Sequence, residues 1–96
     1  QHDPLWRLPL YQPYISYLQS NIADLANSGS STMAGCINAA LFLQCFVPKT
    51  IDWVHVDVYS WNDSDRPGKP AGGEAQGLRA ALAWLKIVFK YYSIYD

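Results

Sequence analysis

Residues 53–59 read WVHVDVY, a stretch in which every second residue is valine. This period-two alternation is typical of a β-strand, with the valines on one face and the larger or polar side chains on the other. A single strand cannot pair its own backbone N–H and C=O groups. The stretch therefore predicts one strand that pairs with strands from a larger protein or from other copies.

Helical spacing is present on both sides of this strand. Apolar residues at positions 14, 17, 18, 22 and 25 predict a helix that frays or ends around residues 21–24. A second helix is expected from a cap at Ser31 or Thr32 to about Phe46, before Pro48. It is apolar nearly all round, so we expect burial on most sides. The predicted fold class is α/β, a helix–strand–helix segment whose sheet is incomplete on its own.

The remaining segments predict an extended start, a long loop and a terminal helix. Three prolines within residues 1–13 predict an extended or looping start. Residues 60–73 are rich in Pro, Gly, Asp, Asn and Ser and predict a long loop. A terminal amphipathic helix is expected from Glu74, on the apolar residues Leu78, Leu82, Leu85, Phe89 and Tyr92.

Composition limits the function classes. The 96 residues suffice for one small domain; half are hydrophobic and 16% are charged, with a net charge of −1. Nothing in this charge balance favours nucleic acid or an anionic membrane, and the longest apolar stretch, residues 33–47, is too short and interrupted to span one. So few charges suggest that other polypeptide covers much of the surface. The chain begins at Gln1 without a signal-peptide pattern, so we expect a processed product or part of a longer protein.

Two constellations resemble metal sites, and each has a simpler reading. His55 and Asp57 share one strand face and are either two metal ligands or a hydrogen-bonded structural pair. Acidic residues and a glycine at positions 63, 65, 68 and 74 match part of a calcium loop, but Pro67 occupies a position that needs a side-chain oxygen. No group of residues forms a recognised catalytic or metal-ligand pattern, so we assign neither.

Five segments in order resemble the C-terminal part of the leucine aminopeptidase (cytosol aminopeptidase) family. Residues 6–9 (WRLP), 23–27 (ADLAN), 34–43 (AGCINAALFL) and 53–57 (WVHVD) each resemble a family motif. Gly72, Gly77 and Arg79 fit the start of the family's last helix. The similarity covers nearly the whole chain. It implies that residues 1–96 are a C-terminal segment of a three-layer metallo-aminopeptidase catalytic domain.

The resemblance implies a cytoplasmic exopeptidase that removes N-terminal residues from peptides and assembles as a hexamer. In such enzymes two divalent metals, zinc or manganese, polarise the peptide carbonyl and supply hydroxide. Their ligands lie upstream of the matched region, so this segment is expected to bind no metal, to be inactive alone, and to depend on the remainder of the catalytic domain.

The resemblance also implies a place for substrate. The stretch after the Trp-x-His-x-Asp strand lines the pocket for the substrate's first side chain, and the family usually has Ala-Gly where this chain has Tyr59-Ser60. We therefore expect Tyr59 and Asn62 to face that side chain, or else Tyr59 to pack in the core. Glu74-Ala75 also departs from the usual Thr-Gly. Two alternatives stay open: a non-catalytic structural or interaction domain derived from this fold, and an unrelated small binding module.

Overall fold

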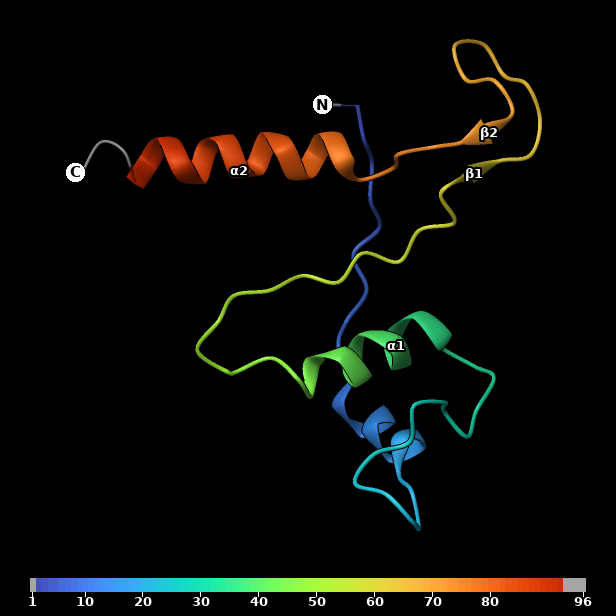
Figure 1. Cartoon of the computed structure of the whole chain (residues 1–96), viewed down its shortest axis with the longest axis vertical. Helices are drawn as coiled ribbons and strands as arrows, with labels where there is room; N and C mark the ends of the chain where they lie inside the picture. Colours follow the sequence, from blue (N-terminus) through green and yellow to red (C-terminus); the bar gives the residue numbers. More distant parts are fainter. Residues whose placement is uncertain (1, 93–96) are drawn as a thin grey trace. The chain divides into compact units, whose positions relative to one another are not determined.

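Figure 1 shows a computed structural model of the chain, which describes residues 2–92. The elements in chain order are η1 (Gln12–Leu18), α1 (Gly35–Gln44), β1 (Trp61–Asn62), β2 (Gly72–Gly73) and α2 (Leu78–Tyr92). The described residues form two compact units, one of residues 7–55 and one that joins residues 2–6 to residues 56–92. Among the helices of residues 2–92, none combines the length and the apolar character needed to cross a bilayer.

The unit of residues 7–55 is built on the contact between η1 and α1, which lie side by side in Figure 1. Its small core consists of Leu18, Ala40 and Leu41, of which Leu41 is fully buried. Leu43 and Phe46, in and just beyond α1, remain exposed. The expectation that this helix is buried on most sides is therefore not met within the unit of residues 7–55, where α1 is covered on the side that faces η1.

The first helix is shorter than the apolar spacing predicts. η1 is a 3₁₀ helix that ends at Leu18, and the Ser20 hydroxyl then accepts hydrogen bonds from the N–H groups of Ile22 and Ala23. Such local bonds offer the backbone an alternative to helix. The N–H of Ala26 donates to the Leu18 carbonyl at 2.7 Å, so the chain turns back. The prediction of helix beyond residue 18 is wrong.

α1 begins later than the sequence predicts. The residue before it is Ala34, which has a left-handed backbone (φ 54°) and no side-chain cap. The Ser31 hydroxyl instead accepts the N–H of Met33 at 3.1 Å and stabilises the preceding turn. The predicted cap at Ser31 or Thr32 is therefore wrong, because the turn uses the hydroxyl before the helix starts.

The strand predicted over residues 53–59 is absent from the described part of the chain. The stretch has no ladder partner there, and Val54 and Tyr59 are 78% and 74% exposed. A strand needs a neighbour to satisfy its backbone, and residues 2–92 supply none for this stretch. The sheet that does form is the two-stranded antiparallel pair β1–β2, inside the region predicted as a loop.

The terminal helix α2 is confirmed, and its start is set by a residue far away in sequence. The carboxylate of Asp3 accepts the N–H of Gly77 at 2.9 Å and that of Ala80 at 3.1 Å. These are among the N–H groups that a helix leaves unpaired at its beginning. The hydrogen bond from Gly77, followed by that from Ala80, holds the pKa of Asp3 below its usual range. The helix therefore begins at Leu78 rather than at Glu74.

Candidate functional site

The hairpin of residues 61–74, in the unit that contains α2, is held by a network of polar contacts. Its strands pair Trp61 with Gly73 and Asn62 with Gly72. At its tip, the backbones of Arg66 and Lys69 exchange two hydrogen bonds of 2.9 and 2.8 Å around Pro67-Gly68. Gly68 has a φ of +72°, and proline followed by a positive-φ glycine is the residue pair of a type II turn.

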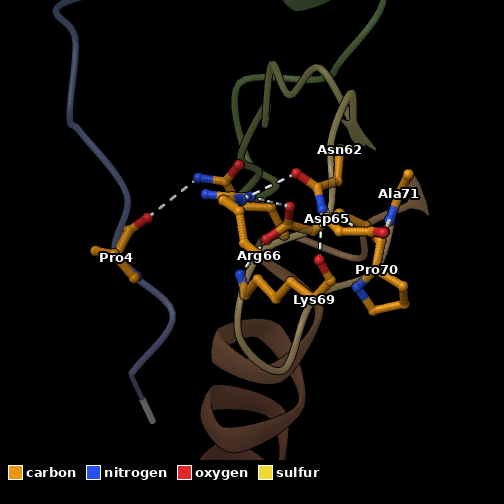
Figure 2. A network of polar contacts seen from close by, with 9 residues as sticks. Pro4, Asn62, Asp65, Arg66, Lys69, Pro70 and Ala71 are labelled. Atoms are coloured by element: carbon orange, nitrogen blue, oxygen red, sulfur yellow. Dashed lines mark hydrogen bonds and ion pairs between the residues drawn. The ribbon is translucent and has the colours of Figure 1, made fainter.

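Asn62 holds the two sides of this hairpin together. Its side-chain amide donates to the carbonyls of Lys69 (2.7 Å) and Pro70 (2.9 Å), and its oxygen accepts Nε of Arg66 (2.9 Å). Figure 2 shows this network. Asn62 is only 5% exposed. A bond of this kind contributes about 0.5–1.5 kcal/mol, and a buried group left unpaired costs more.

Charged side chains close the outer face of the hairpin. Glu74 forms ion pairs with Arg66, at 2.9 Å, and with Lys69. The hydrogen bond from Lys69 and the positive charges of Lys69 and Arg66 lower the pKa of Glu74. Both cations are about half exposed, so these pairs contribute less than the buried bonds of Asn62. Together the contacts make an ordered hairpin from a segment that the sequence describes only as a loop.

A pocket of about 310 Å³ lies against this hairpin, and Tyr59 lines it. Its other walls include Trp61, Arg66, Glu74 and Arg79. The Tyr59 hydroxyl donates to Oδ1 of Asp63 at 3.1 Å. The structure thus brings Tyr59 to a concave surface, whereas Asn62 lies in the hairpin behind that surface with its amide committed to backbone and Arg66.

Ser60, between Tyr59 and β1, has a left-handed backbone with φ of 58°. Its carbonyl accepts the N–H of Glu74 at 2.9 Å, which extends the pairing of the hairpin by one bond. Residues other than glycine adopt this conformation at a cost. The strained position immediately follows the candidate pocket residue and turns the chain from Tyr59 into the hairpin.

The acidic residues that resemble a calcium loop have other partners. Asp63 accepts from Tyr59, Asp65 accepts the N–H of Ala71 at 2.8 Å, and Glu74 pairs with Arg66 and Lys69. Within residues 2–92, no three His, Cys, Asp or Glu side chains lie together in a group that could hold a metal ion. The described residues therefore do not fit a metal site, and their carboxylates serve the hairpin.

Sequence reasoning missed three of these features. The Asn62 cross-links, the Tyr59–Asp63 hydrogen bond and the Asp3 cap each join residues that no motif connects. A signal was available only for the turn, since Pro67-Gly68 is a readable turn pair. For Asp3, a distance of 74 positions along the chain to Gly77 leaves no local pattern to find.

Comparison with known proteins places this geometry in a family. The profile described as "Cytosol aminopeptidase family, catalytic domain" matches residues 1–82. The probable cytosol aminopeptidase of Syntrophobacter fumaroxidans is 44% identical over 88 residues, and that of Synechococcus sp. (strain CC9311) is 42% identical over 85 residues. These matches cover 85% and 86% of this chain and 17% of each relative.

A solved structure gives the same result. The crystal structure of cytosol aminopeptidase from Coxiella burnetii matches 88% of this chain and 18% of that chain, with 58% sequence identity and a TM-score of 0.83. The fold and the sequence therefore both identify a segment of a protein of this family. The chain belongs to the cytosol aminopeptidase family and spans about one-sixth of the length of the curated relatives that it matches.

Proposed function

We propose that this chain is the C-terminal segment of the catalytic domain of a metal-dependent, leucyl-type aminopeptidase that removes N-terminal residues from peptides. The observation that carries the proposal is the family match over residues 1–82, supported by relatives named as probable cytosol aminopeptidases. In this proposal the segment contributes core and pocket wall, and the reacting groups come from other parts of the catalytic domain.

The proposal requires two divalent metal ions, zinc or manganese, held by residues that this segment does not supply. The acidic side chains of the hairpin are engaged with Tyr59, with a backbone N–H and with two cations. We therefore assign no metal ligand and no catalytic residue to the described part of the chain.

The contribution to substrate binding is assigned to Tyr59 and Asn62. Tyr59 is 74% exposed and lines the pocket, as a side chain available to a ligand must. Asn62 contributes through the hairpin behind that wall, because its amide is already hydrogen-bonded. The substrate class is a peptide, with the first side chain lying against Tyr59.

The proposed partners are the remainder of the catalytic domain and further copies of the same protein. By resemblance to the family, the assembly is a hexamer and lies in the cytoplasm. Exposed apolar side chains support the proposal that other polypeptide covers this chain, because many large ones are exposed. In α2 alone they include Leu78, Leu82, Trp84, Ile87 and Phe89. Surfaces of this kind are typical of interfaces.

A non-catalytic structural or interaction domain derived from the same fold is the second candidate. The lack of a metal-ligand group in the described residues fits both candidates, because the first proposal places the ligands upstream of this segment. The two candidates differ in whether a protein that carries this segment also carries the upstream metal ligands.

The experiment is the hydrolysis of leucyl substrates by a purified protein that contains this segment within a complete catalytic domain. We expect leucine release that a chelator abolishes and that zinc or manganese restores. A folded protein of that length that releases no amino acid with either metal would overturn the aminopeptidase proposal and favour the second candidate.

The pocket wall has its own test in the same protein. Because a tyrosine ring fills far more space than the small residue usual in the family, Tyr59→Ala should raise kcat/KM for bulky N-terminal side chains relative to alanine. The expected change in that ratio is about 10-fold, the lower range for a pocket contact. An unchanged ratio combined with a lower melting temperature would place Tyr59 in the core.

A further inference from the structure

We propose that Asp63 is a positioning residue that fixes the orientation of Tyr59 and so sets the side-chain preference of the pocket. The inference rests on the proposed function, in which Tyr59 lines the pocket for the substrate's first side chain. It adds a specificity-determining role for a residue that never needs to touch the substrate.

The orientation of the Tyr59 ring depends on its hydrogen bond to Asp63, called the tether below. The residue is 74% exposed in its unit, so packing there leaves its ring free to choose among rotamers. The hydrogen bond from its hydroxyl to Oδ1 of Asp63, at 3.1 Å, is the one polar contact of this side chain within the described residues. That bond holds the hydroxyl end of the ring, which lines the pocket, at a fixed position.

Asp63 can act as an anchor because its neighbour is fixed. It directly follows Asn62, whose amide bonds to the carbonyls of Lys69 and Pro70 join the two sides of the hairpin. Arg66 donates to Asn62 (Figure 2). It also donates to Glu74, which directly follows β2, so the cross-link reaches the second strand of the hairpin. The anchor therefore belongs to an ordered hairpin rather than to a free loop.

The position of Ser60 strengthens the argument. Its left-handed backbone lies between Tyr59 and Trp61, at the point where the chain enters the hairpin. A strained residue persists only where surrounding contacts hold it. Here the Ser60 carbonyl accepts the N–H of Glu74, which ties the strained turn to the same hairpin.

The tether predicts how the preference among N-terminal side chains changes when the hydrogen bond is lost. With the hydrogen bond intact, the ring is held against the pocket and disfavours bulky N-terminal side chains. Without it, the ring can rotate away, and bulky side chains gain relative to alanine. One hydrogen bond of this kind corresponds to about a 3-fold to 10-fold change in the ratio of kcat/KM values.

The experiment compares variants of the complete protein by the ratio of kcat/KM for phenylalanyl and alanyl substrates. This ratio does not depend on how much of a sample is folded. Tyr59→Phe removes the donor and keeps the ring, and Asp63→Ala removes the acceptor. Each should raise the ratio about 3-fold to 10-fold, and the double variant should raise it no further than either single change.

Two further variants serve as controls. Asp63→Asn keeps a side-chain oxygen that can accept the tyrosine hydroxyl, so it should preserve the wild-type ratio. Asp52→Ala removes an exposed carboxylate outside the hairpin and should leave the ratio unchanged.

The outcomes separate this inference from the proposed function. If Tyr59→Ala shifts the preference while Tyr59→Phe and Asp63→Ala do not, the pocket assignment stands and the tether is wrong. If no variant shifts the preference, both are wrong. If the complete protein hydrolyses no aminoacyl substrate, the proposed function is wrong. This inference is then wrong as well, because it rests on that function.

Discussion

At the scale of single residues, Ser60 is the position where backbone geometry and sequence disagree most clearly. Its φ of 58° suits glycine, which the resemblance implies is usual at this position. We expect Ser60→Gly to leave the free energy of unfolding unchanged or slightly higher. Ser60→Val should lower it by about 1–3 kcal/mol, because a β-branched residue tolerates this region poorly. Chemical denaturation of the complete protein measures both changes, and equal stability of the two variants would mean that the turn is not held in this conformation.

The candidate site residues show what sequence reasoning can reach at this scale. Tyr59 was predicted to face a ligand, and the structure places it on a pocket wall, although its role there remains a prediction. For Asn62 the expectation rests on its place in the stretch that the resemblance puts at the pocket, and the structure uses its amide within the hairpin. A sequence gives the order of residues after a strand but not which of them turn inward, since that depends on contacts such as Asn62 with Lys69 and Pro70.

At the scale of elements, the cap of α2 provides a pH-dependent test. The folded-state pKa of Asp3 is lowered, so its contribution to stability is present above its ordinary pKa of 3.8 and is lost as the pH falls through the lowered value. We therefore expect Asp3→Ala to lower the melting temperature of the complete protein at neutral pH, and this difference should shrink as the pH drops below about 4.

Asp3→Asn is the matched variant for this test, because it retains an acceptor oxygen without the charge. It should recover part of the loss at neutral pH and should show less pH dependence than wild type. A melting-temperature difference between wild type and Asp3→Ala that stays constant or grows in acid would contradict the assignment of Asp3 as the cap.

The elements also divide into those that local sequence determines and those that it does not. α2 was predictable because Leu78, Leu82, Leu85 and Phe89 recur at helical spacing. The strand expected over residues 53–59 does not form. The alternation of its residues indicates only a tendency to pair, and pairing depends on a partner strand elsewhere. The absence of the expected strand would have favoured an unrelated binding module, but the family match and the 58% identity to a solved cytosol aminopeptidase decide against that reading.

At the scale of the whole molecule, the chain exposes more apolar surface than a stable small domain usually tolerates. Trp6 is 90% exposed and Ile22 is 99% exposed, while the buried apolar core comprises three residues within the described part of the chain. We expect the isolated 96-residue chain to self-associate or to remain poorly ordered in solution. Sedimentation and calorimetry measure this directly, and a monodisperse monomer with one sharp, cooperative melting transition would count against it.

We propose that this chain is part of an aminopeptidase catalytic domain and that the reacting groups lie elsewhere in that domain. The most direct measurement is leucine release from a leucyl substrate by the pure, correctly sized 96-residue chain, with zinc or manganese added. A complete protein that carries the segment is assayed alongside as the reference. We expect metal-dependent release by the complete protein and none by the isolated chain. Metal-dependent release by the isolated chain would show that this segment carries the reacting groups itself.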